Sequence, residues 1–345
     1  MDQQQAPATQ AESPFEILAN GQRLQFAWDA TSLSTFKACP RKFYYAQVLG
    51  LRGKERAAPL DFGGFLHDML EKFDRALAGG KDHETAVREV VRYGLGVTTT
   101  YAELPLLDSN GAPVLDEQGM PMNARQPVFW GSDDNRRTRQ TLIRTFIWST
   151  EQFRNDPLKT MIMPSGKPAL ELSFRLELPI KTPNGRNYLW CGHMDKICEV
   201  QGHPYIQERK HTVTTLSPTY FDKYSPNTQV TGYIFSAGVV LGRPVMGAFI
   251  DAAQVAVGFS RFGRSIQNRT PDQIDEWYKG SLYWIKQAEA CAEANYYPMN
   301  EESCSNFGGC PFRNVCSKDQ KVRKMYLDQD FQHRAWNPLQ DREVL

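Results

Sequence analysis

The sequence lacks the features that define several large protein classes. No apolar run among its 345 residues approaches the roughly 18 that a membrane-spanning helix needs. No basic segment followed by an apolar one stands at its start, so we expect no secretory signal and a cytosolic, cytoplasmic protein. No G-x-x-x-x-G-K-S/T motif occurs, which argues against a P-loop helicase motor in the chain. No period of about 20–50 residues repeats, which excludes solenoids and propellers.

The chain also has no excess of charge of either sign. Forty Lys and Arg residues stand against 39 Asp and Glu residues, so the net charge is +1. No global field draws such a protein to nucleic acid or to a membrane, and any DNA contact must come from a local patch. Six basic residues fall within 31–60, namely Lys37, Arg41, Lys42, Arg52, Lys54 and Arg56. Phe43, Tyr44 and Tyr45 lie among them, which predicts either a single-strand contact through phosphates and stacked bases or a solvated helix over packed aromatics.

Seven cysteines, an odd number, make a disulfide framework a poor interpretation. Cys304, Cys310 and Cys316 cluster near the end, and thiolates select zinc or iron–sulfur clusters. Cys39 is the best candidate for a fourth ligand. Because no C-x-x-C knuckle occurs, we favour a [4Fe–4S] cluster over Zn²⁺, with buried free thiols as the third alternative. The other cysteines are predicted to pack in strands or a helix: Cys191, Cys198 and Cys291.

Apolar periodicity predicts an α/β fold with a mixed central sheet flanked by helices. The expected helices are 33–48, 62–78, 83–94, 136–153, 218–240 and 271–296. The expected strands are 169–180, 188–200 and 205–210, with one or two more in 245–259. We expect a flexible tail over 1–30, one folded domain over 31–317 and a C-terminal tail over 318–345. The Gly- and Pro-rich stretch 101–133 reads as an insertion, in the form of a hairpin.

Two carboxylates and a lysine in the middle of the sequence have the pattern of a metal site. Glu208 and Lys210 are two apart on a predicted strand, so their side chains share a face. Asp195 lies on the neighbouring predicted strand, so the two carboxylates can converge. Hard oxygen ligands of this kind suit Mg²⁺ or Mn²⁺, and a lysine beside them can orient a water or neutralise charge on a phosphate. The alternative is a solvated strand end with a Glu–Lys ion pair.

Other residues could complete such a site. Gln229 and Tyr233 are one turn apart on a predicted helix, where they could bind phosphates or bases, or simply pack. His67 follows Gly63 and Gly64, small residues that would permit a close approach to another backbone or a phosphate, but a lone helical histidine is more often structural. Glu171 at the start of the first long strand could be a further acidic neighbour or an exposed strand residue.

These pieces together resemble the RecB-like, AddB-like iron–sulfur branch of the PD-(D/E)XK nucleases, which includes CRISPR-associated adaptation exonucleases and phage-encoded relatives. The resemblance spans about 31–317, in the order LSTFKACPRKFYY, FGGFLHDMLEKF, ALELSFRLEL, GHMDKI, IQERKHT, QVTGY and YPMNEESCSNFGGCPFRNVC. The family commonly has C-x-x-C near its end, whereas five residues separate Cys304 and Cys310 here. The resemblance implies a restriction-endonuclease-like fold.

The resemblance also implies roles for single residues. It makes His67, Asp195, Glu208 and the Arg209 carbonyl ligands of the divalent metal. Lys210 would be the catalytic lysine, and Gln229 and Tyr233 would handle DNA. The cluster would be held by four cysteines that join the N- and C-terminal segments: Cys39, Cys304, Cys310 and Cys316.

The expected function is therefore that of an Mg²⁺- or Mn²⁺-dependent deoxyribonuclease, an exonuclease on single strands or duplex ends, in recombination, repair or replication. A structure-selective endonuclease and a catalytically silent DNA-binding or assembly subunit are the alternatives. A third is a zinc-stapled module that binds partners through residues 101–133. By the same resemblance we expect DNA and a helicase or recombination protein as partners, no membrane, and the cytosol of a bacterium or a phage-infected host.

Overall fold

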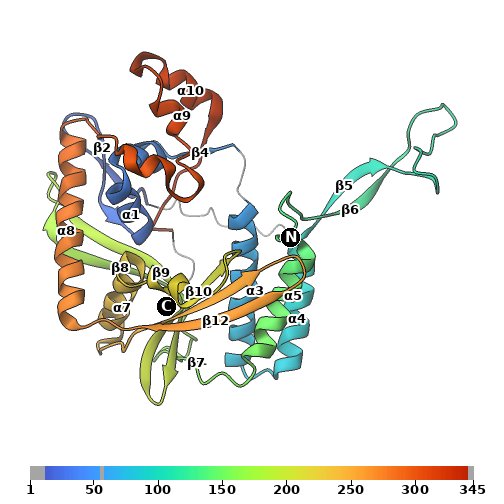
Figure 1. Ribbon diagram of the computed structural model, residues 1–345, viewed down its shortest axis with the longest axis horizontal. Helices are drawn as coiled ribbons and strands as arrows, with labels where there is room; N and C mark the ends of the chain where they lie inside the picture. The colour runs from blue at the N-terminus through green and yellow to red at the C-terminus, as the bar shows by residue number, and fades with distance from the viewer. Residues whose placement is uncertain (1–11, 55–57, 341–345) are drawn as a thin grey trace, which may run out of the picture.

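The centre of the molecule is a mixed seven-stranded sheet. The computed structural model describes residues 12–54 and 58–340 (Figure 1). The sheet has the order β12 (Ser260–Gln267), β11 (Ala248–Val255), β10 (His203–Thr212), β9 (Asn187–Val200) and β3 (Ala27–Trp28), and both β7 (Lys159–Thr160) and β8 (Leu170–Lys181) also pair with β9. The prediction of a mixed central sheet flanked by helices is confirmed.

Tight turns and one crossover set the strand directions. β8 and β9 form an antiparallel hairpin closed at Gly185, and β9 and β10 form another closed at Gln201 and Gly202, all three with positive φ angles. A two-residue turn with both φ angles positive matches the twist of the strands it joins. β10 and β11 are parallel, so a helical crossover must separate them in the chain. That crossover contains α6 (Pro218–Asp222) and α7 (Thr228–Leu241).

Helices cover both faces of the sheet because successive strand residues point to opposite sides. On β9, Lys196 bonds Asp74 of α3 (Ala58–Ala78), whereas the adjacent Ile197 lies in the core with α7 residues such as Val230. α3 packs with α4 (His83–Val97) and α5 (Arg139–Gln152), and α7 packs with α1 (Ala30–Ala38) and α8 (Pro271–Glu293). These two helical groups flank the strands in Figure 1. Among the described helices, none is both long and apolar enough to cross a membrane.

Both ends of the described chain are folded further than the sequence predicts. β1 (Phe15–Ile17), β2 (Arg23–Gln25) and β3 lie within the expected N-terminal tail, and Trp28 is fully buried. Within the expected C-terminal tail, α10 (Arg323–Asp330) leads into β13 (Phe331–His333), which pairs with β4 (Leu51–Gly53). These short segments carry little periodicity of their own and gain their stability from partners that are distant in sequence. Residues 1–11 and 341–345 lie outside the described part.

The expected insertion projects from the helical side of the molecule (Figure 1). β5 (Thr99–Pro105) and β6 (Asn123–Phe129) pair along their whole length, and the chain between them makes two tight turns, each organised by an aspartate. The Asp108 carboxylate accepts from the Asn110 and Ala112 amides, and the Asp116 carboxylate accepts from the Gln118 and Met120 amides in the same way.

Candidate active site

The candidate residues gather where two strands of the sheet separate. β9 and β10 are paired from Val200–His203 as far as Lys196–Gln207. Beyond that pair, β9 continues beside β8 and β10 continues beside β11. Asp195 and Glu208 are the first opposing residues past the last pair. The Arg209 amide donates to Asp195 Oδ2 at 2.8 Å and so bridges the start of this opening. We call the opening the fork.

Glu171 brings a third carboxylate to the fork. The pairs Leu170–Lys196 and Leu172–Met194 leave Glu171 opposite Asp195, so acidic residues stand in a row on three adjacent strands. Glu171 has a φ angle of 50° and its side chain is buried. A left-handed backbone at a residue other than glycine costs on the order of 1–3 kcal/mol and is found where the surroundings impose it. This strained backbone angle indicates that the fold holds the Glu171 carboxylate in one particular place beside Asp195.

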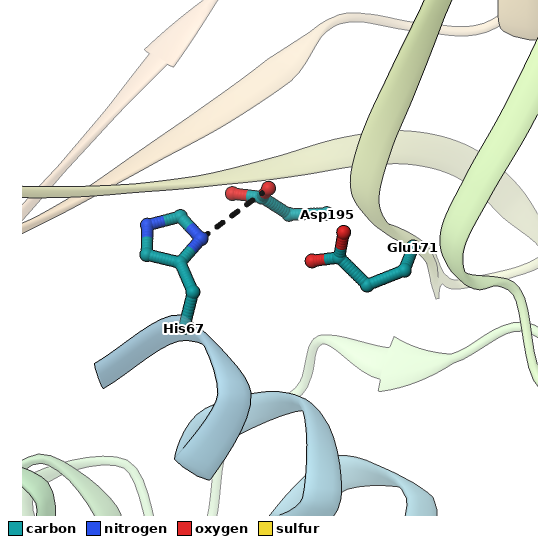
Figure 2. A group of neighbouring side chains, drawn as sticks. All are labelled: His67, Glu171 and Asp195. Carbon is teal, nitrogen blue, oxygen red and sulfur yellow. Dashed lines mark ion pairs between the residues drawn. The ribbon is translucent and has the colours of Figure 1, made fainter. Parts of the chain in front are cut away.

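His67 reaches the carboxylates from α3. Ligand atoms of His67, Glu171 and Asp195 all lie within 4.8 Å of one another, and Figure 2 shows the three side chains turned toward a common space. His67 Nδ1 is 3.5 Å from Asp195 Oδ1. Burial would lower the pKa of His67, but Asp195 and Glu208 outweigh it and raise that pKa above its ordinary value. An imidazole with two carboxylates is a donor set that binds divalent cations, so this group could hold a metal ion.

Glycine lets α3 come close enough to place His67. A Cβ atom at Gly63 would lie 2.4 Å from a ring carbon of His211, which follows Lys210 on β10. Any larger residue would therefore push α3 away from the strand that carries Glu208. Gly64 faces open space, so of the two glycines only Gly63 makes the close approach that the sequence predicts. Gly63 approaches the His211 side chain and not a backbone segment.

Glu208 is buried with one oxygen unused. Its Oε1 accepts from Lys210 Nζ at 2.6 Å, whereas its Oε2 is buried and has no hydrogen-bond partner among the described residues. Burial and the charge of Asp195 raise the pKa of Glu208 to about 7, against the lowering effect of Lys210. Burial would also raise the pKa of Asp195, but His67, Lys210 and the Arg209 amide hold it well below its usual range. A bound cation would give the free oxygen a partner and relieve this repulsion, so the residues fit a divalent metal.

A chain of hydrogen bonds leads from Glu208 to α7. Lys210 Nζ donates to Glu208 Oε1 and, at 2.9 Å, to Gln229 Oε1. Gln229 Nε2 donates to the Tyr233 hydroxyl at 3.3 Å. The Asn227 side chain accepts from the first amides of α7 and so fixes the helix end that carries Gln229. The structure thus places Gln229 and Tyr233 at the fork, with Gln229 as a direct partner of the lysine.

Burial of these groups favours particular protonation states. Burial would lower the pKa of Lys210, but Glu208 and Asp195 outweigh it and raise that pKa, so the amine is a cation at neutral pH. Burial and the two carboxylates also raise the pKa of Tyr233 well above its ordinary value. Lys210 is therefore suited to neutralise charge on a phosphate, and Tyr233 retains a proton to donate.

A second buried network, which the sequence did not reveal, lies behind the fork. Asp74 of α3 accepts from Lys196 at 3.2 Å and also bonds Arg209. Lys196 follows Asp195, and Arg209 lies between Glu208 and Lys210, so one carboxylate anchors both strands beside their functional residues. Asp74 is 6% exposed. The available signal was a charged residue on the apolar face of a predicted helix, seven residues after His67.

The candidate cluster cysteines lie where the two ends of the chain meet. The Asn300 amide donates to Cys39 Sγ at 3.4 Å, and the Cys310 amide bonds the Cys304 carbonyl at 2.9 Å. Burial raises the pKa of the Cys316 thiol, and despite the opposing effect of Arg41, the neighbouring Cys310 and Cys39 raise it further. Contacts of Asn300 and Ser303 with Ala38 and Cys39 thus bring the start of the C-terminal cysteine segment beside Cys39. Cys191 and Cys198 are fully buried on β9, and Cys291 is partly buried on α8.

In the basic segment 31–60, the aromatic side chains do not form a surface on which nucleic-acid bases could stack. Phe43 is 1% exposed and Tyr45 is 6% exposed, so neither ring is available to a base. Tyr44 stacks on Tyr297 at 4.8 Å between ring centroids. Of the two interpretations of these aromatics, packing beneath a helix is the one that fits, because the helical period turns Phe43 and Tyr45 into the core. Arg52 bonds backbone carbonyls, and Arg56 lies outside the described residues.

Comparisons with known proteins place the chain by its sequence. It matches the PD-(D/E)XK nuclease superfamily over residues 27–317. No curated protein matches it significantly. Among solved structures it is similar to a protein from Eubacterium rectale provisionally described as an exonuclease, with a TM-score of 0.45 and 10% identity, covering 87% of this chain and 92% of that one. It is also similar to the protein SSO0001, with a TM-score of 0.29 and 10% identity, covering 75% and 76% of the two chains.

Proposed function

We propose, because this chain belongs to the PD-(D/E)XK nuclease superfamily, that it is a divalent-metal-dependent deoxyribonuclease acting on single strands or duplex ends. The observation that carries the proposal is the row of Glu171, Asp195 and Glu208 across three strands at the fork, with His67 and Lys210 beside it. The preference for ends, and a role in recombination, repair or replication, rest on the RecB-like order of the motifs.

The chemistry divides between the metal and the side chains. His67, Glu171, Asp195, Glu208 and the Arg209 carbonyl would hold the cation, which supplies positive charge to the scissile phosphate and acidifies a water. Lys210, held between Glu208 and Gln229, places an ammonium where negative charge grows on the phosphate. Tyr233, which accepts from Gln229, has its own proton free for a phosphate or base oxygen.

Digestion of matched linear and circular DNA tests this proposal. End-labelled linear and circular DNA, both single- and double-stranded, would be incubated with Mg²⁺ or Mn²⁺ and with a chelator. We expect metal-dependent cleavage of linear substrates only. Cleavage of circles would establish an endonuclease instead, and an inert protein would favour a silent DNA-binding subunit. The Glu208→Gln variant controls for a contaminating nuclease.

Replacement of Gln229 by alanine should lower turnover without changing metal affinity. The variant loses an acceptor that holds the Lys210 ammonium, and hydrogen bonds to charged groups contribute about 1.5–3 kcal/mol, so we expect a loss of about tenfold or more. Tyr233→Phe removes a hydroxyl one step further away and should mainly weaken DNA binding. Calorimetric titration with Mn²⁺ should show affinities within about twofold of the wild type. A large loss of metal affinity would instead place Gln229 among the ligands.

For the four cysteines we propose a [4Fe–4S] cluster that joins the two ends of the chain, as in the RecB-like and AddB-like branch. Cys39 lies between α1 and α2 (Pro40–Phe43), and Cys316 ends α9 (Arg313–Cys316). The preference for the cluster over zinc rests on the sequence, which has no C-x-x-C knuckle, and Zn²⁺ is the alternative.

Loss of Cys39 should therefore remove iron and lower stability. Protein purified without oxygen is expected to be brown and to contain about four irons per chain. Cys39→Ser should lose the colour and unfold at a lower temperature, because the link between distant segments is broken. The matched control is Cys191→Ser, which replaces a buried strand cysteine and should keep the colour. A colourless wild type with one zinc per chain would refute the cluster, and a brown Cys39→Ser variant would refute the link.

A further inference from the structure

A cavity of about 470 Å³ opens beside the fork, between the sheet and the helices α3 and α5. Its size lies within the range of about 300–1,000 Å³ that small-molecule sites occupy. Its walls are largely apolar and include three aromatic rings, Phe73, Phe153 and Phe262. His67 and Lys210 form part of the same lining, so the cavity begins where the scissile phosphate would be held.

One polar atom in the cavity wall has no hydrogen-bond partner in the part of the chain that the structure describes. Gln207 is 4% exposed, and its Nε2 donates to Asp251 Oδ2 at 2.6 Å. Because a carboxylate only accepts, this bond fixes the orientation of the amide. The Gln207 Oε1 atom is buried, and residues 12–54 and 58–340 supply no hydrogen-bond donor to it. An unpaired buried acceptor lowers the free energy of unfolding, and a ligand that donates a hydrogen bond to it would remove this cost.

The charges around the cavity favour an anionic ligand. Five Lys and Arg residues contribute to its lining: Arg154, Lys159, Lys196, Arg209 and Lys210. Three acidic residues oppose them, Asp74, Asp156 and Asp251. Arg154 and Lys159 are both exposed, but Arg154 already pairs with Glu84 and Glu151. Lys159 is therefore the more accessible cation for an incoming ligand. A ligand with an aromatic part, a hydrogen-bond donor and a negative charge matches the three properties together.

We propose that this cavity receives the base of the nucleotide attached to the scissile phosphate, so that the enzyme acts on an unpaired nucleotide. The inference rests on the proposed nuclease function and specifies its substrate. The base would lie against the aromatic rings while its phosphate stays at His67 and Lys210. Every DNA base carries a donor on its pairing edge that Gln207 Oε1 can accept, so the pocket requires an unpaired base without selecting one.

Removal of bases at constant charge tests the proposal. A fluorescein-labelled single-stranded oligonucleotide would be compared with one of equal length made of abasic tetrahydrofuran residues. Binding is measured by anisotropy in a chelator, so the readout does not depend on metal. We expect the normal strand to bind about tenfold more tightly, as stacking of a base on a ring predicts. A single abasic residue moved along the strand should also slow cleavage of the bond beside it.

Two variants connect this base dependence to the cavity. Ser149 lines the cavity from α5, and Ser149→Trp fills the space, so the normal strand should bind as weakly as the abasic one. Phe153→Ala removes one aromatic ring from the cavity. It should reduce the difference in affinity between the normal and the abasic strand. The control is Gln140→Trp, which adds the same side chain at an exposed position of α5 outside the cavity lining and should leave both affinities unchanged.

The outcomes separate this inference from the nuclease proposal. Equal binding of the two strands by the wild type overturns the base pocket, whether or not the protein cleaves DNA. Base dependence that survives both Ser149→Trp and Phe153→Ala also overturns it, because the bases must then bind elsewhere. Base-dependent binding that Ser149→Trp abolishes and Phe153→Ala weakens, in a protein that cleaves nothing, supports the pocket and refutes the nuclease.

Discussion

Lys210→Ala is expected to reduce phosphodiester cleavage by about a hundred- to a thousandfold, the usual cost of removing one group that stabilises transition-state charge. Lys210 bonds both Glu208 and Gln229, so its ammonium is held in one place, and no second lysine contacts Glu208 among the described residues. Rates should be measured in a single turnover with saturating Mg²⁺. Lys279→Ala, an exposed lysine on α8, is the matched control and should retain full activity.

Metal binding should distinguish this lysine from the carboxylates. Asp195→Asn and Glu208→Gln should abolish cleavage and also weaken Mn²⁺ binding by at least about tenfold, because each removes a negative ligand. Lys210→Ala should bind Mn²⁺ as tightly as the wild type or more tightly. The Glu208→Ala and Lys210→Ala effects should not add in the double variant, since both groups serve one step. Near-full activity of Lys210→Ala would refute the assignment of this site.

Asp74→Ala is expected to lower the free energy of unfolding by about 3–5 kcal/mol, the cost of removing one partner from a buried ion pair. Asp74 is 6% exposed and binds two buried cations, Lys196 and Arg209, which would lose the one carboxylate that they share. Urea unfolding followed by circular dichroism measures the loss. The control is Asp328→Ala, which breaks an exposed pair with Lys324 and should cost less than about 1 kcal/mol.

A second variant separates the positional role of Asp74 from its contribution to stability. Replacing Asp74, Lys196 and Arg209 together by leucine or methionine removes the stranded charges and should recover most of the lost stability. Cleavage should stay low in this variant, because the strands beside Asp195 and Glu208 are no longer held by a directional contact. If activity recovered together with stability, Asp74 would have only a structural role.

The elements that the sequence predicts well are those whose signal is local. The strands expected at 169–180 and 188–200, with a turn at Asn184–Gly185 between them, correspond to β8 and β9. The expected helices 62–78 and 271–296 correspond to α3 and α8, which span 58–78 and 271–293. The predicted helix 33–48 instead ends at Ala38 and restarts at Pro40, and the predicted helix 218–240 divides into α6 and α7. In both places a proline lies near the break and outweighs the apolar pattern.

Sequence alone predicted the candidate site, because the spacing of Glu208 and Lys210 on a strand sets a shared face, and it also places the chain in its superfamily. Only the tertiary structure decided which further side chains lie beside Glu208 and Lys210. Glu171 reaches the metal group through a strained backbone angle, and Asp74 reaches Arg209 from a helix more than a hundred residues earlier. Contacts of this kind depend on register between strands and on how closely a helix packs, and neither leaves a periodic mark in the sequence.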